Sequence, residues 1–284
     1  MIYFLTVNYY STNLVAKLIS SLRDSRGVES KTLIINNSPD DDSIHQLKTE
    51  SVIILDATHN LGFGSACNLG LQFIYAEEPQ AIAWIINPDA YIFENTLAQV
   101  NPFFNLHPEV SILGTIVHTP SGIIWFAGGC FIPATGAILS QNLLANTDED
   151  YVTCDWVSGC SLIVNLKKFP DCPQFDAAYF LYYEDFDFCR RYTNQGHIIA
   201  ITKQFGVLHQ PSSITNRYIF QKIKHSTYSY FLTLDRYTNK RILILRLTRL
   251  LCYAFILIAI KPQVAFGKFR GVLIYLRDKH LKIF

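Results

Sequence analysis

The chain has 284 residues, of which 50% are hydrophobic, 14% aromatic and 17% charged. This composition provides a substantial core for one large or two small domains, and it excludes a disordered chain, a collagen and a disulfide-stapled mini-protein. The seven cysteines form no CxxC pair and no zinc-ligand spacing, and the amino terminus has no secretory leader pattern. We therefore expect reduced thiols in a cytoplasmic protein.

The charge is unevenly distributed along the chain, although the net charge is only +1. Residues 201–284 contain 15 Lys and Arg against two acids, which gives +13 and leaves −12 for residues 1–200. The basic residues alternate with long apolar runs. An anionic membrane surface fits this segment better than a nucleic acid, and we expect no nucleic-acid partner.

The amino-terminal half alternates short apolar runs with helical patterns. Runs at residues 2–7, 32–35, 52–55 and 82–86 are typical of buried parallel strands. Helical spacing of apolar residues follows the first run and recurs over residues 65–76. This order predicts an α/β fold with a mostly parallel sheet flanked by helices.

Polar clusters follow three of these strands, at residues 8–12, 36–42 and 87–89. In an open α/β sheet, ligands bind beyond the carboxyl ends of the strands. We therefore expect the three clusters to line one crevice.

The segment beyond residue 240 differs in character from the rest. Apolar runs at 242–247 and 250–260 are separated by Arg246 and Arg249, and the longest uncharged run has 11 residues. A bilayer-spanning helix needs about 20. The pattern favours interfacial amphipathic helices over a spanning helix, and the alternative is that these helices pack on the sheet as part of the core.

The turn after the fourth strand carries one carboxylate, in the sequence Asn87-Pro88-Asp89. Proline fixes its own φ and favours an extended conformation for Asn87, so Asp89 is held in place. A carboxylate here is a hard oxygen ligand that suits Mg²⁺ or Mn²⁺ bridging a diphosphate. The alternative is an ordinary turn.

A glycine-containing loop at residues 60–64 precedes a predicted helix. Its two glycines let backbone N–H groups approach an anion or a nucleotide. The dinucleotide-binding fingerprint fails because Cys67 occupies the third glycine position. The alternative is a glycine-rich turn around a packed Phe63.

Three acids within four residues, Glu184, Asp185 and Asp187, open a later helix among aromatic residues. Glu184 and Asp187 share a helix face at i, i+3, whereas Asp185 points elsewhere. A partly desolvated Asp185 is suited to act as the general base for a hydroxyl. For the other two acids, capping or pairing with Arg190 or Arg191 is an equally good interpretation.

His209 leaves a strand into a loop, where a histidine can ligate a metal or contact a phosphate. A lone histidine is more often structural. His209 therefore acquires significance only together with the other motifs.

Taken in order, the motifs resemble those of glycosyltransferase family 2, and most closely its bacterial rhamnosyltransferase-like members. They lie within residues 2–235 and comprise residues 6–9 (Thr-Val-Asn-Tyr), 35–38 (Ile-Asn-Asn-Ser), 60–64 (Asn-Leu-Gly-Phe-Gly), 87–89 (Asn-Pro-Asp), 157–160 (Val-Ser-Gly-Cys) and 183–187 (Tyr-Glu-Asp-Phe-Asp).

This resemblance implies a GT-A fold, with a nucleotide-binding part at about residues 1–110, an acceptor part at about 111–235 and a basic helical tail at 236–284. It implies inverting transfer of a sugar, rhamnose or another hexose, from a dTDP- or UDP-sugar. The acceptor would be a saccharide or a lipid-linked saccharide in bacterial surface polysaccharide synthesis. The enzyme would be peripheral on the inner face of the cell membrane.

The resemblance also assigns roles to residues. Asp185 matches the catalytic base, with Glu184 beside it, and Asp89 would hold a divalent metal (Mg²⁺ or Mn²⁺) near His209. The residues bordering the nucleotide and the donor would be Val7, Asn8, Tyr9, Asn36, Asn60, Gly62, Phe63, Gly64, Asn68, Asn87 and Gly159.

Two departures from the family pattern concern the donor site. The family usually has an aspartate where Asn36 stands, and Asn87 replaces one acid of the metal motif. These departures leave open a second hypothesis, a noncatalytic sugar-nucleotide-binding or scaffold protein of the same fold. A nucleotidyltransferase is disfavoured, because residues 8–12 contain neither a glycine nor a basic residue.

Overall fold

The computed structural model describes residues 1–23, 28–210 and 215–281. The chain forms two compact units. The first comprises Met1–Cys130, Leu139–Ala177 and Asp185–Pro211, and the second comprises Phe131–Ile138, Ala178–Glu184 and Ser212–Phe284. Each unit is described separately below.

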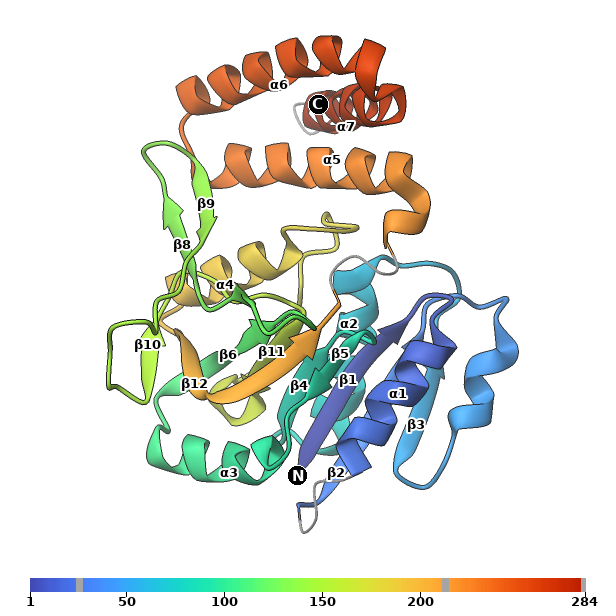
Figure 1. Ribbon diagram of the computed structural model, residues 1–284, viewed down its shortest axis with the longest axis vertical. Helices are drawn as coiled ribbons and strands as arrows, with labels where there is room; N and C mark the ends of the chain where they lie inside the picture. The colour runs from blue at the N-terminus through green and yellow to red at the C-terminus, as the bar shows by residue number, and fades with distance from the viewer. Residues whose placement is uncertain (24–27, 211–214, 282–284) are drawn as a thin grey trace. The chain divides into compact units, whose positions relative to one another are not determined.

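A ten-stranded sheet forms the centre of the first unit, with the order β10-β12-β6-β11-β4-β1-β2-β3 and with β5 and β7 paired at the side to β12 and β6 (Figure 1). The strands are β1 (Ile2–Asn8), β2 (Ser30–Asn36), β3 (Val52–Asp56), β4 (Ile82–Ile86), β5 (Ala90–Ile92), β6 (Val110–His118), β7 (Ile124–Phe126), β10 (Tyr151–Thr153), β11 (Ser161–Asn165) and β12 (Ile198–His209). A separate two-stranded sheet is formed by β8 (Gly129–Ile132) and β9 (Ala137–Ser140).

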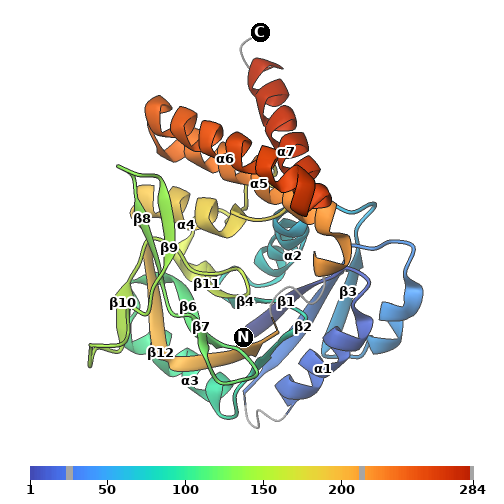
Figure 2. The same cartoon turned by 45° about the horizontal axis from the view of Figure 1, so that its top comes forward.

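The first four strands are parallel to one another, and β11 inserts antiparallel between β4 and β6. The predicted class, a mixed and mostly parallel sheet flanked by helices, is therefore confirmed. Helices α1 and α3 cover one face and α2 and α4 the other (Figure 2). The helices are α1 (Thr12–Arg23), α2 (Phe63–Glu77), α3 (Thr96–Leu106) and α4 (Glu184–Asn194), with short 3-10 turns η1 (Asp42–Leu47) and η2 (Leu166–Lys168).

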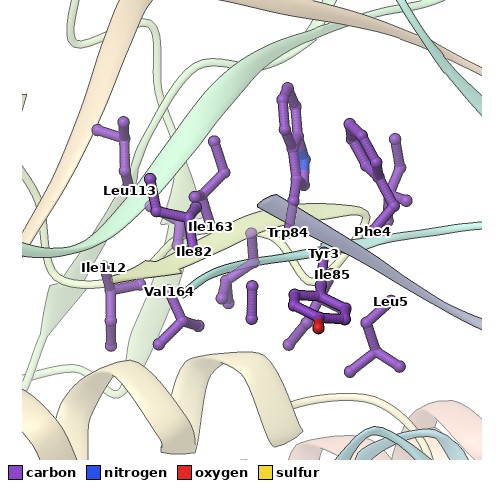
Figure 3. Close-up of a cluster of buried hydrophobic side chains, with 14 of the residues drawn as sticks. Tyr3, Phe4, Leu5, Ile82, Trp84, Ile85, Ile112, Leu113, Ile163 and Val164 are labelled. Carbon is purple, nitrogen blue, oxygen red and sulfur yellow. The ribbon is translucent and has the colours of Figure 1, made fainter. Parts of the chain in front are cut away.

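The sheet is buried on both faces, which explains why its central strands are continuous apolar runs. Phe4 and Trp84 point to one face, and Leu5 and Ile85 to the other (Figure 3). All four side chains are fully buried. This core fixes the strand register and thus the positions of the polar residues that follow each strand.

The second unit contains three helices, α5 (Ile219–Tyr237), α6 (Lys240–Ile260) and α7 (Pro262–Leu281), preceded by the 3-10 turn η3 (Thr215–Tyr218). Helices α5 and α7 approach closely at Gly271, where a Cβ would lie 2.6 Å from the carbonyl oxygen of Lys224. Phe231, Leu234 and Val272 belong to the buried cluster of this unit. Helix α5 therefore packs with α6 and α7. The sequence analysis expected the helical tail to begin only at residue 236, near the end of α5.

Helix α6 differs from the sequence expectation. It is one continuous helix of 21 residues containing an 18-residue window with a mean hydropathy of 2.1, so by length and composition it could cross a membrane. From the sequence we expected no membrane-spanning helix, because no uncharged run exceeded 11 residues. The helix, however, continues through Arg246 and Arg249. Most of its apolar side chains are exposed: Ile244, Leu245, Tyr253, Phe255, Ile256, Ile258 and Ile260.

Candidate active site

A row of hydrogen-bonded polar side chains follows the carboxyl ends of β1, β2 and β3. Asn8, Asn36 and Asp56 occupy matching register positions on the three strands. Asn8 Nδ2 donates to Asn36 Oδ1 at 3.1 Å, and Asn36 Nδ2 donates to Asp56 Oδ1 at 2.9 Å. His45 Nε2, from η1, lies 3.2 Å from the same Asp56 oxygen. We call these four residues the polar row.

The two asparagines of the polar row are buried, and their amides bond to neighbouring protein groups. Asn8 Oδ1 accepts from both the N–H and the hydroxyl of Ser11, each at 3.0 Å, and thereby fixes the start of α1. Asn36 Oδ1 also accepts from the Ser38 hydroxyl at 3.2 Å. The predicted residues Asn8 and Asn36 are thus brought together, with Asp56 and His45 beside them.

Residues at the end of β1 and just after it lie next to the polar row in the chain. Val7 is buried in the strand, and Tyr9 is partly exposed with its ring edge-on to Tyr10 at 5.0 Å between centroids. The Tyr10 hydroxyl donates to Asp40 at 2.6 Å. This contact links the loop after β1 to the loop after β2.

The glycine-containing loop is fastened to β2 by Asn37, a residue that the sequence motifs did not single out. Asn37 Oδ1 accepts from the Leu61 N–H at 2.8 Å, and its Nδ2 donates to Asn60 Oδ1 at 3.0 Å. The Gly62 N–H donates to the same Asn60 oxygen at 3.0 Å. Asn60 and Gly62 are therefore held in a defined turn that leads into α2.

Helix α2 begins at Phe63 and Gly64, and no side chain caps its amino terminus. One turn later, Asn68 donates to the carbonyl of Phe175 at 2.9 Å and accepts from its N–H at 2.7 Å. Both polar groups of the Asn68 side chain are used in this contact, which ties α2 to the loop before α4. The Phe63 ring packs edge-on against Phe175.

Asp89 and His209 are neighbours because of strand pairing. β5 runs antiparallel to β12 and places Ala90 opposite His209. As a result, Asp89 Oδ1 lies 3.2 Å from His209 Nε2, and both side chains are buried. Among the described residues, His209 Nδ1 is buried without a hydrogen-bond partner. The exposed Trp125 ring lies edge-on to His209 at 5.2 Å.

These two side chains have the chemistry of a divalent-cation site that a ligand completes. No group of three or more His, Cys, Asp or Glu side chains arranged to hold a metal occurs within residues 1–23, 28–210 and 215–281. One carboxylate oxygen and one imidazole nitrogen leave positions for diphosphate oxygens and water, which is how Mg²⁺ is commonly held beside a phosphate. The residues present therefore fit such a cation.

Asp185 lies in the first turn of α4 and is partly buried. Its Oδ2 accepts from the Gly159 N–H at 2.9 Å and its Oδ1 from the Phe186 N–H at 2.8 Å. A Cβ at position 159 would lie 3.2 Å from the Phe63 ring and 3.5 Å from the Asp185 Cβ, so glycine permits this close approach. Two residues before Asp185, Tyr183 has a left-handed backbone with φ 66°, a costly conformation that often accompanies functional sites.

The two carboxylates both lie near the segment at residues 159–160. Gly159 contacts Asp185, and the carbonyl of Cys160 accepts from the N–H of Asn87, two residues before Asp89. Burial raises the pKa of the Cys160 thiol well above its usual value, and the charges of Asp89 and Asp185 raise it further. Both carboxylates are therefore close enough to the Cys160 thiol to affect its pKa.

Burial also raises the pKa of Asp185, while the N–H groups of Gly159 and Phe186 oppose that shift. The other two acids of the motif differ. Asp187 is fully buried and accepts from Arg191 Nε at 2.7 Å, which confirms the pairing interpretation for this residue. Glu184 is buried beside Asp185.

The fold, with these polar residues beyond the carboxyl ends of its parallel strands, is the GT-A fold of glycosyltransferases. No family model matches the sequence. The chain is 25% identical over 215 residues, 66% of its length and 69% of the relative's, to the N-acetylglucosaminyl-diphospho-decaprenol L-rhamnosyltransferase of Mycobacterium tuberculosis.

Solved structures confirm the fold. GalNAc-T7 with UDP, GalNAc and Mn²⁺ superimposes with a TM-score of 0.60 at 12% identity, over 81% of this chain and about half (47%) of that one. A mannosyltransferase of Pyrobaculum calidifontis with GDP-Man and Mn²⁺ gives 0.57 at 13% identity, over 98% of this chain and 87% of that one. TarS of S. aureus, residues 1–349, gives 0.54 at 14% identity, over 82% and 64%. These likenesses agree with the resemblance that the motifs indicated.

Proposed function

We propose that this chain is an inverting glycosyltransferase that moves a sugar from a nucleoside diphosphate donor to a saccharide or lipid-linked acceptor in bacterial surface polysaccharide synthesis. The observation that carries the proposal is the proximity of both Asp89 and Asp185 to residues 159–160. Inverting transfer requires a base on the acceptor side and charge neutralisation on the leaving-group side. The relative's name supports a rhamnosyl donor and a lipid-linked acceptor.

Asp185 acts as the base. It takes the proton of the acceptor hydroxyl as that oxygen bonds to the anomeric carbon and the bond from this carbon to the diphosphate oxygen breaks. The N–H groups of Gly159 and Phe186 fix the orientation of the carboxylate. Glu184, the buried residue directly before Asp185 in the sequence, positions the acceptor.

Asp89 and His209 face the leaving diphosphate. A divalent cation, Mg²⁺ or Mn²⁺, held by Asp89 and His209 would neutralise the negative charge that develops on this group. The Mn²⁺ named with two of the structures of the same fold supports this role. The Gln210 N–H donates to the Asp89 carbonyl at 3.2 Å. This bond joins the backbone of Asp89 to the backbone directly after His209.

The donor occupies the crevice between the strand ends and α2. Val7, Asn8, Tyr9 and Asn36 border the nucleoside of a dTDP- or UDP-sugar. Asn68 acts indirectly, through its contact with Phe175. The residues that border the diphosphate and the donor sugar are Asn60, Gly62, Phe63, Gly64, Asn87 and Gly159.

The second unit fits the surface of an anionic membrane, which would place the enzyme as a peripheral protein on the inner face of the cell membrane. Apolar side chains of α6 are exposed, and basic residues accompany them. Apolar burial combined with attraction between basic side chains and anionic lipids is how interfacial helices bind. The basic residues on and beside α6 and α7 are Arg241, Arg246, Arg249, Lys261, Lys268 and Arg270.

The test is the variant Asp185→Asn, assayed with dTDP-rhamnose and other nucleotide sugars in the presence of Mn²⁺ or Mg²⁺. Removing the base should lower kcat by about 10²–10⁴-fold, the usual contribution of general base catalysis. The affinity for the donor should remain within about twofold. Asp148→Asn, at an exposed acid, is the charge-matched control and should retain full activity.

Full activity of Asp185→Asn would exclude this residue from the mechanism. The noncatalytic alternative, favoured by Asn87 in the place of a metal-binding acid, has a different outcome. Wild-type protein would then bind a nucleotide sugar but transfer it no faster than Asp185→Asn.

A further inference from the structure

The polar row ends in a carboxylate that the sequence motifs did not include. The Asp56 side chain is 51% exposed at the carboxyl end of β3, whereas Asn8 and Asn36 are buried. Two contacts of Asp56 with the described residues use one oxygen, Oδ1, which accepts a hydrogen bond from Asn36 Nδ2 and faces His45 Nε2. Its second oxygen, Oδ2, makes no hydrogen bond with the described residues.

In the family that the motifs resemble, an aspartate usually stands at the position of Asn36. In this chain the Asn36 side chain is not free to bind a nucleobase. Asn36 Nδ2 donates to Asp56 Oδ1 at 2.9 Å and to the Asp41 carbonyl at 3.4 Å, so both of its amide hydrogens are used. Its oxygen accepts from Asn8 and Ser38. Asn36 therefore fills its hydrogen-bonding capacity inside the protein and supports Asp56 instead of facing a ligand.

We infer that Asp56 is the residue that reads the nucleobase of the donor, and that it selects bases carrying an imino N–H, such as uracil and thymine. This inference rests on the proposed function. A carboxylate oxygen only accepts hydrogen bonds, so it pairs with the N3–H of uracil or thymine and repels the unprotonated N3 of cytosine. His45 and Asn36 hold the carboxylate by its other oxygen and so fix the direction of the free one.

The experiment measures binding of UDP and of N3-methyl-UDP, which lacks the N3–H, by calorimetry with Mn²⁺ present. Wild-type protein should prefer UDP by about tenfold to a hundredfold, the range for a hydrogen bond to a charged group. Asp56→Ala should bind the two ligands with equal affinity. Asp42→Asn, at a nearby exposed acid of η1, should retain the wild-type preference.

Because Asp56 is exposed, Asp56→Ala should fold, and circular dichroism checks this. Asp56→Asn is a second variant that keeps the shape and the contact with Asn36 but removes the charge. Its amide oxygen would still accept from Asn36 Nδ2. The amide nitrogen, which only donates, would then stand in the place of the free oxygen, so the preference for UDP should be lost.

Two other results would overturn the inference. If Asp56→Ala lowered the affinity for UDP and N3-methyl-UDP equally, Asp56 would contact the ribose or support the fold. If both variants kept the wild-type preference, another residue would read the base, and the proposed transferase function would stand. Failure of the wild-type protein to bind any nucleoside diphosphate would instead reject the proposed function itself, and this inference with it.

Discussion

The surroundings of the Asp185 carboxylate change its pKa. Burial raises its pKa, while the N–H groups of Gly159 and Phe186 favour the ionised form and limit the rise. A general base works best when its pKa lies near the working pH. A raised pKa therefore makes Asp185 a stronger base than an exposed aspartate.

This shift gives a pH-dependence prediction. Only ionised Asp185 can take a proton, so kcat/KM should rise as the pH rises through the raised pKa. The acid limb of the profile should therefore lie above about 4, the value of an ordinary aspartate. Steady-state rates between pH 4 and 8 at saturating Mn²⁺ test this. An acid limb at or below pH 4 would contradict the assignment of Asp185 as the base in this environment.

The sequence identified the residues whose significance lies in a local motif. Asp89 follows a strand and a proline, and Asp185 stands in an acidic cluster that opens a helix, so both could be found from neighbouring letters. His45, Asp56 and the role of Asn37, which lies within the motif at residues 35–38, could not be found in this way. Their partners are 11 to 25 residues distant in sequence and become neighbours only through the parallel register of β2 and β3.

Among the elements, the buried strands were predicted most accurately. The apolar run at 2–7 became Ile2–Asn8, and the run at 82–86 became Ile82–Ile86. Helix α3 was not predicted, because Pro102 and scattered polar residues interrupt its apolar pattern. The last strand, which His209 was expected to leave, runs over Ile198–His209 and has a register irregularity between Thr202 and Gly206 that the sequence does not reveal.

The packing of α5 against α7 leads to an element-scale prediction. Substituting Gly271→Val would place a branched side chain where a Cβ already lies 2.6 Å from the Lys224 carbonyl and 2.7 Å from the Thr227 Cβ. Overpacking of this kind costs about 1–3 kcal/mol. We expect a lower free energy of unfolding and faster hydrogen exchange in α5 and α7.

Leu273→Val, two residues further along α7 at an exposed position, is the control for a valine on this helix, whose propensity is higher than that of glycine and cannot account for a loss of stability at position 271. It should change the exchange of the two helices little. Equal effects of the two substitutions would show that the close approach at Gly271 contributes nothing to stability.

At the scale of the whole molecule, charge and structure divide the chain in a similar way. The sheet-based unit carries Asp89 and Asp185, and the helical unit holds most of the basic residues beyond position 200. The charge asymmetry and the apolar runs were visible in the sequence. The continuity of α6 was not visible, because Arg246 and Arg249 within it resembled boundaries between shorter helices.

The exposed apolar residues of α6 give the last prediction. Replacing Phe255 and Ile256 together with serine should lower binding to vesicles containing phosphatidylglycerol by at least tenfold, since each buried apolar side chain contributes about 1.5–3 kcal/mol. Ile123→Ser is the control in the other unit, because Ile123 is 66% exposed and Ile256 is 63% exposed. Vesicle flotation measures binding, and 1 M salt should release a peripheral protein by screening its basic residues. Wild-type binding by the double variant would exclude α6 as the membrane-contacting element, and retention in 1 M salt would show that apolar burial, which salt does not screen, holds the protein on the vesicle.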